Sequence, residues 1–211
     1  MSRASPVLLI HGIDDTEALF RKMRHYLQRH GRDVHSINLV PNNGDAGLDK
    51  LAQQVVACVE PRFRDGETID LIGFSMGGLV ARYYVQRLGG LKRVRRFVTI
   101  SSPHKGTFTA FLRRNEGARQ MRPGSPFLCD LDPDMEMLER LSFTSIWTPF
   151  DLMIVPAHSS ELSAGRTIRV EVAAHPLMVS SPRVLKLVLE ALTAGEQVTP
   201  SQAGSDGNPE L

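Results

Sequence analysis

The sequence has few of the residues that stabilise secreted or membrane-embedded chains. Among its 211 residues there are two cysteines, one tryptophan and 6% aromatic residues. Cys58 and Cys129 lie far apart, which favours two reduced thiols over a disulfide framework. No apolar run is long enough to cross a membrane, and His11 interrupts the N-terminal apolar segment too early for a signal peptide. These absences predict a cytoplasmic protein, unless a leader has been removed.

A strong charge imbalance is also absent, because the formal net charge is only +2. There is accordingly no electrostatic argument for a nucleic-acid partner. Four histidines, His25, His30, His35 and His158, show no spacing typical of metal ligands, so we expect them to be surface or packing residues. The sequence therefore predicts neither a metal nor another cofactor.

What the sequence does have is a regular alternation of apolar runs and helical patterns. The expected strands are Val7–Ile10, Val34–Leu39, Ile69–Phe74, Val94–Ser101, Ser142–Phe150 and Arg166–Ala173. Helical periodicity follows most of them, which is typical of a parallel sheet covered on both faces. We predict an α/β fold with about six strands, mostly parallel, and helices on both faces.

The domain organisation follows from the same pattern. Residues 1–195 are expected to form a single domain, since a chain of this length buries a sufficient core without disulfides or metals. The regularity lapses at about 103–141, which predicts an irregular insertion resembling a cap. Residues 196–211 have almost no apolar content and are predicted to be a disordered tail.

The most informative segment runs from Ile69 to Tyr84. Gly73, Ser75 and Gly77 have the G-x-S-x-G spacing of a nucleophile elbow, where a strand reverses sharply into a helix with the serine at the apex. Because this spacing arises by chance in about one chain in ten to twenty of this length, the apolar strand before it and the helical pattern after it decide the interpretation. We predict that Ser75 is a nucleophile.

A serine nucleophile needs a base, and the base needs a group that orients it. On a parallel sheet such groups gather at the carboxyl ends of the strands. Asp151 and His175 each follow an expected strand, in the order Ser, Asp, His. The alternatives are His104 as the base and Asp132 or Asp134, in a turn-like Asp-Pro segment, as the acid. Asp70 begins a strand and therefore lies at the wrong end of the sheet.

These motifs resemble the α/β-hydrolase superfamily, and in particular its small bacterial lipases and esterases with little or no lid, which are similar to triacylglycerol lipases. The resemblance covers about Val7 to Leu192. The segments that carry it are His11-Gly12-Ile13, Gly73-Phe74-Ser75-Met76-Gly77-Gly78, the acid loop 144–155, the histidine loop 174–181 and the loop 101–107.

The resemblance implies a hydrolase that forms an acyl-enzyme intermediate. Ser75 would be the nucleophile, His175 the base and Asp151 the orienting acid. The backbone N–H groups of Ile13 and Met76 would form the oxyanion hole. His11, Gly12 and His104 are the expected substrate-binding residues; packing beside the elbow is the alternative for His11, and fixing the strand end is the alternative for His104.

The leading hypothesis is a serine carboxylic-ester hydrolase, a lipase or esterase, acting on lipid or small-molecule acyl esters. The same triad would serve a thioesterase, an amidase or an acyltransferase, since specificity depends on the pocket walls. The hypothesis from another class is a non-catalytic acyl- or protein-binding module, for which a broken triad would be the sign.

Several basic residues are candidates for contact with a lipid surface. They are most simply solvated, but together with Phe108, Phe111 and Phe127 they would also suit peripheral contact with a membrane. The residues in question are Arg93, Arg95, Arg96, Arg113, Arg114, Arg119 and Arg122.

Overall fold

The computed structural model describes residues 4–194, so the expected tail at 196–211 lies outside the described residues. Six strands form one sheet in the order β2-β1-β3-β4-β5-β6, and each neighbouring pair is parallel. The strands are β1 (Val7–Ile10), β2 (Val34–Ile37), β3 (Ile69–Phe74), β4 (Val94–Ile100), β5 (Ser142–Trp147) and β6 (Arg166–Arg169). The predicted α/β fold with a six-stranded parallel sheet is confirmed.

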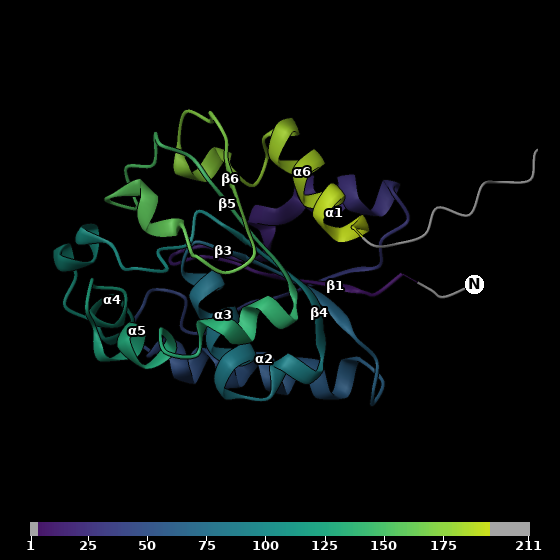
Figure 1. Ribbon diagram of the computed structural model, residues 1–211, viewed down its shortest axis with the longest axis horizontal. Coiled ribbons are helices and arrows are strands. Elements are labelled where there is room, and N and C mark those ends of the chain that lie inside the picture. The colour runs from purple at the N-terminus through teal and green to yellow at the C-terminus, as the bar shows by residue number, and fades with distance from the viewer. Residues whose placement is uncertain (1–3, 195–211) are drawn as a thin grey trace, which may run out of the picture.

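Helices cover both faces of this sheet, as a parallel sheet requires. They are α1 (Arg21–Arg29), α2 (Leu48–Arg62), α3 (Met76–Arg87), α4 (Glu116–Gln120), α5 (Pro126–Leu131) and α6 (Pro182–Thr193). Helices α1 and α6 lie on one face, whereas α2 and α3 lie on the other (Figure 1). Within residues 4–194, no helix is long and apolar enough to span a bilayer.

Strand β1 shows why a doubly covered strand has an unbroken apolar sequence. Leu8 and Ile10 belong to the core beneath α2 and α3, whereas Val7 and Leu9 belong to the core beneath α1 and α6. Successive side chains of a strand point to opposite faces, so each face receives apolar residues only if every position is apolar.

Some predicted boundaries were wrong. The strand expected at Arg166–Ala173 ends at Arg169, because its partner β5 ends at Trp147, the residue paired with Arg169. The irregular insertion contains two short helices, α4 and α5, between two 3-10 helices, Phe108–Leu112 and Met135–Arg140. Helices α4 and α5 are too short to produce a periodic apolar pattern, which is why the sequence did not predict them.

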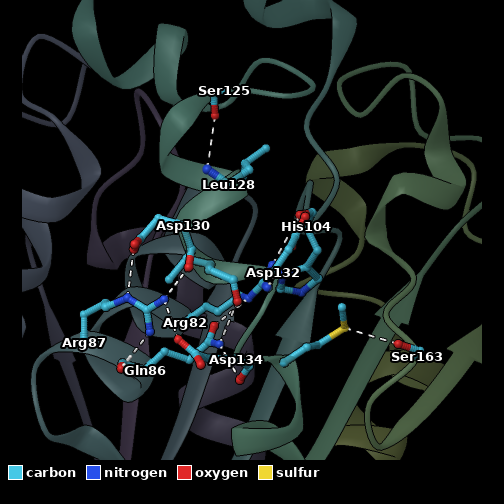
Figure 2. Close-up of polar contacts among 12 residues, drawn as sticks. Arg82, Gln86, Arg87, His104, Ser125, Leu128, Asp130, Asp132, Asp134 and Ser163 are labelled. Carbon is cyan, nitrogen blue, oxygen red and sulfur yellow. Dashed lines mark hydrogen bonds and ion pairs between the residues drawn. The ribbon is translucent and has the colours of Figure 1, made fainter.

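The insertion is held against α3 by a buried polar cluster (Figure 2). Arg82 is fully buried, and its guanidinium donates hydrogen bonds to Gln86 at 2.8 Å and to Asp132 at 3.0 Å. Gln86 in turn donates to the carbonyl oxygens of Leu131 at 2.9 Å and Asp134 at 2.8 Å. The Asp132 carboxylate therefore pairs with Arg82 of α3. The Asp134 carboxylate pairs with Arg87 of the same helix at 2.8 Å. This placement does not fit either aspartate as the triad acid.

A second cluster of buried polar side chains lies near the amino ends of β3 and β4. It contains Arg96, so the expectation that Arg96 is solvated is wrong. Arg96 and Asp70 are both fully buried, and Arg96 donates to the Asp70 carboxylate at 3.2 Å. Arg96 also donates to the carbonyl oxygen of Ala194, at the end of α6. Arg93 lies at the same end of β4, where it donates to the carbonyl oxygen of Glu67. These arginines are structural and lie far from the carboxyl ends of the strands.

Candidate active site

Ser75 lies at a sharp reversal between β3 and α3. Its φ of 53° is in the left-handed region, which is unfavourable for any residue other than glycine and often marks a functional site. The reversal brings α3 against β1: a side chain on Gly77 would fall well inside van der Waals contact with the carbonyl oxygens of Ile10 and His11. A side chain on Gly73 would lie 2.5 Å from the Cα of Gly78. The two glycines predicted to flank the serine are thus sterically required.

Asp151 and His175 form the hydrogen bond that the sequence order predicts. His175 Nδ1–H donates to Asp151 Oδ2 at 2.7 Å, and both side chains are nearly buried. The other carboxylate oxygen, Asp151 Oδ1, accepts the backbone N–H groups of Met153 at 3.0 Å and Ile154 at 2.9 Å. The imidazole lies against the ring of Phe74, the residue before the serine, with 4.7 Å between ring centroids. The acid is therefore fixed by its own loop, and the imidazole is fixed between the acid and the elbow.

The two expected oxyanion donors both lie near Ser75. Met76 is the first residue of α3, where backbone N–H groups have no acceptor within the helix and the helix dipole favours negative charge. Ile13 follows β1 and lines the same cavity as Ser75. The next residue, Asp14, has a φ of 59° and donates its N–H to the carbonyl oxygen of Asn42 at 2.8 Å, which fixes the loop.

His11 and His104 do not reach the cavity, so the expectation that they contact substrate is corrected. Both side chains are completely buried. His11 donates Nδ1–H to the carbonyl oxygen of Gly12 at 2.8 Å and accepts the N–H of Leu39 at its Nε2 atom at 2.9 Å. His104 Nε2 lies 3.0 Å from the hydroxyl of Thr99, and burial holds the pKa of His104 well below its usual range. Both side chains fix the ends of strands. Because His104 has no contact with solvent, it is not suited to act as the base.

The cavity at Ser75 has a volume of about 300 Å³ and a mostly apolar lining. That volume is at the lower end of the range for small-molecule sites. Besides Ser75 and Ile13, its walls come from the insertion and from the acid loop. These residues are Pro103, Thr107, Thr109, Ala110, Leu112, Arg113, Ala118, Met121, Leu152, Met153 and Ile154.

The sequence identified part of this lining, since the loop 101–107 and the acid loop 144–155 both contribute to it, but it did not identify Asp15. The lining residues between Thr109 and Met121 come from segments without a motif, and the folding of these segments brings them to Ser75. Asp15 is the second residue after the His11-Gly12-Ile13 strand end, and that position was the available signal. Within residues 4–194, no group of three or more His, Cys, Asp or Glu side chains is arranged to hold a metal ion.

Comparison with known families shows which family this chain belongs to. The model of the palmitoyl protein thioesterase family matches residues 6–130, which is more than half of the 211 residues. The chain belongs to the palmitoyl protein thioesterase family. The matched range includes the elbow and the strand end at Ile13, whereas Asp151 and His175 lie beyond it.

Other members and relatives share only part of their length with this thioesterase-family chain. Palmitoyl-protein thioesterase 3 of Dictyostelium discoideum is 28% identical over 117 residues, which is 51% of this chain and 39% of that protein. A triacylglycerol lipase of Pseudarthrobacter phenanthrenivorans is 33% identical over 110 residues, which is 48% of this chain and 34% of the lipase. The chain thus spans little more than a third of the length of these curated relatives.

Solved structures show that this family member has the α/β-hydrolase fold. The mature form of a Bacillus licheniformis lipase superimposes with a TM-score of 0.75 at 14% identity, covering 91% of this chain and 93% of the lipase. Lipase B of Aspergillus fumigatus also gives a TM-score of 0.75, at 18% identity, covering 90% of this chain and 52% of the lipase. The α/β-hydrolase resemblance inferred from the sequence motifs is confirmed.

Proposed function

We propose that this protein is a serine hydrolase that cleaves acyl esters through an acyl-enzyme intermediate. The observation that carries the proposal is the 2.7 Å hydrogen bond between His175 and Asp151, with the imidazole held against the elbow that presents Ser75. An imidazole whose Nδ1–H is bound to a carboxylate presents Nε2 as the basic atom.

In the proposed reaction, Ser75 Oγ attacks the acyl carbonyl carbon while His175 Nε2 accepts the hydroxyl proton. The carbonyl oxygen becomes an oxyanion, which the N–H groups of Ile13 and Met76 stabilise by roughly 3 kcal/mol per donor. The bond to the leaving group breaks, and the leaving group departs with the proton from His175. Water then attacks the acyl-enzyme, gives its proton to His175, and the carboxylic acid leaves as Ser75 regains its hydrogen.

The apolar cavity supports an acyl chain as the part of the substrate bound beside Ser75. Ala110, Ala118, Met121 and Ile154 are nearly or fully buried and supply its inner wall, whereas Leu112 and Leu152 are among the most exposed apolar residues and lie at its mouth. A small apolar cavity favours acyl chains over charged acids.

A thioester is the second candidate substrate, and family membership favours it. The experiment measures kcat/KM on matched oxygen esters, thioesters and amides with acyl chains of increasing length. We expect hydrolysis of oxygen esters or thioesters, with kcat/KM rising with chain length until the cavity is filled. Ester and thioester cleavage absent at every chain length would contradict the proposal, and a large preference for thioesters would establish the second candidate.

We further propose that the mouth of the cavity contacts a lipid surface. Among the described residues, nearly all the exposed large apolar side chains lie in three segments around Ser75. They are Phe108, Phe111, Leu112, Phe150, Leu152, Met153, Val155 and Leu177, and Val40 is the exception. A cluster of exposed apolar side chains with a polar border is typical of an interaction site.

Two arginines lie beside this apolar cluster, which favours anionic lipid. Arg113 lines the cavity with a partly exposed side chain that pairs with Asp14, and Arg122 lies over the ring of Phe111 at 4.7 Å from its centroid. Arg119 lies instead with Tyr83 and Phe127 in a different hollow. The expectation that Phe127 takes part is wrong, because its ring is buried and stacks on Tyr83. Arg93 and Arg96 are likewise excluded, since they lie at the other end of the sheet.

The lipid contact predicts that apolar side chains outside the cavity control membrane binding. The double variant Phe108→Glu with Phe111→Glu should weaken sedimentation with phosphatidylglycerol vesicles by at least about tenfold. Hydrolysis of a short, water-soluble ester should stay close to the wild-type rate. Val40→Glu, at an exposed apolar residue away from the site, is the control. Equal vesicle binding by the double variant and by this control would contradict the proposal.

A further inference from the structure

Asp15 places a carboxylate beside Ser75 that the proposed triad does not use. A methyl group in place of a hydrogen of Gly12 would lie 3.0 Å from Asp15 Oδ2 and 3.0 Å from Ser75 Cβ. These two atoms are therefore no more than about 6 Å apart, twice that distance. The same point lies 3.4 Å from the ring of Phe74, against which the His175 imidazole rests. Asp15 and Ser75 thus border one small region, and so does the Phe74 ring on which the His175 imidazole rests.

The backbone of Asp15 is fixed while its carboxylate is uncommitted. The side chain of Asn42 donates a hydrogen bond to the Asp15 carbonyl oxygen at 2.7 Å. The neighbouring acid, Asp14, pairs with Arg113. Within residues 4–194, the Asp15 carboxylate has neither a hydrogen bond nor an ion pair. Burial of this partly exposed carboxylate disfavours its charged form, and no group bonded to it within the described residues offsets that cost.

The charges around Asp15 indicate which group would offset that cost. Burial raises the pKa of Asp15, while attraction to His11 and His175 opposes the rise and repulsion by Asp14 adds to it. Both ring nitrogens of His11 are occupied as in a neutral imidazole, because one donates to Gly12 and the other accepts from Leu39. His175 is therefore the nearby imidazole that would become a cation in the proposed reaction and attract Asp15. His175 itself faces Asp151 at Nδ1 and Asp15 from the β1 loop.

We propose that Asp15 is a positioning residue that stabilises the protonated imidazole of His175 during acyl transfer, an inference that rests on the proposed serine hydrolase mechanism. His175 is neutral before the attack and carries a proton only while the tetrahedral intermediate exists. The attraction to Asp15 therefore acts in the transition state and hardly at all in the ground state, and such a difference accelerates the reaction. Asp151 orients the ring from one side, and Asp15 supplies a second negative charge near it.

The test is the pH dependence of kcat/KM for Asp15→Asn, which removes the charge with little change in shape. A nearby negative charge makes the imidazole easier to protonate, so its removal should move the acid limb of the profile to lower pH. We expect a displacement of about half to one pH unit, toward the lower end of the usual range because Asp15 is only half-buried. The plateau value should fall by about three- to tenfold, because a displacement of half to one pH unit corresponds to that loss of stabilisation of the protonated imidazole.

Two further variants separate this role from a structural one. Asp15→Glu retains the charge and should return the acid limb toward its wild-type position. Asp14→Asn removes the adjacent carboxylate, which pairs with Arg113, and should displace the acid limb by clearly less than Asp15→Asn does. A profile for Asp15→Asn that superimposes on the wild-type profile would overturn the inference, as would an equal displacement in Asp14→Asn. Failure of the proposed function would look different, since the wild-type protein would then have no esterase or thioesterase activity to titrate.

Discussion

Substituting Gly77 by alanine is expected to lower the free energy of unfolding by at least about 3 kcal/mol. The added methyl group would meet the carbonyl oxygens of Ile10 and His11, which belong to the end of β1. Backbone atoms in a central strand cannot move aside as a side chain can, so α3 would have to shift away from the sheet. Urea denaturation followed by circular dichroism measures the loss.

The matched control for this substitution is Gly47→Ala. Gly47 precedes α2 with a φ of −65°, a value that alanine adopts readily. The atoms nearest to its added methyl group are the ends of the Asp49 and Gln120 side chains, which hydrogen-bond to each other and can move aside more easily than backbone. We expect a change within about 1 kcal/mol. If both variants were equally stable, the close approach of α3 to β1 would not be the reason for glycine at position 77.

The sequence was sufficient for the central part of the fold because periodicity and strand order are local properties. Unbroken apolar runs with helical patterns between them predicted the parallel sheet, and its covered strands bear this out. The edge was less predictable: β6 ends where β5 stops providing partners, and a strand's partner is not encoded in its own residues. Boundaries set by pairing therefore differed from boundaries suggested by composition.

The candidate site was predictable to the extent that it follows a topological rule. Residues after the carboxyl ends of parallel strands share one edge of the sheet, so Ser75, Asp151 and His175 were expected together although about a hundred residues separate the first from the last. Their roles remain proposals, while the hydrogen bond between Asp151 and His175 is a feature of the structure.

Burial was the property that the sequence did not reveal. His104 and Arg96 both have polar side chains that are normally exposed, and both are completely buried by contacts from distant segments. The cavity walls have the same origin, since Ala118 and Met121 lie on a segment that distant residues hold in place, for example through the hydrogen bond from the Gly117 N–H to the carbonyl oxygen of Gly44 at 2.8 Å. No local motif reports such contacts.

The second prediction with a large effect concerns the reaction itself. Ser75→Ala should reduce kcat on a cleavable acyl ester or thioester by about 10⁶-fold, since a triad without its nucleophile retains only binding and electrostatic contributions. His175→Ala should lose nearly as much, because the two residues act as a unit and their effects do not add. Both variants should remain folded, because each substitution only shortens a side chain at the edge of the site.

The most direct test of the account is the rate at which a fluorophosphonate modifies Ser75, followed by intact-protein mass spectrometry and peptide mapping. The account predicts a single modification on Ser75 in the wild-type protein, none in Ser75→Ala, and a rate at least about 100-fold lower in His175→Ala. Modification at another residue, or an unchanged rate without the imidazole, would contradict the claim that His175 activates Ser75.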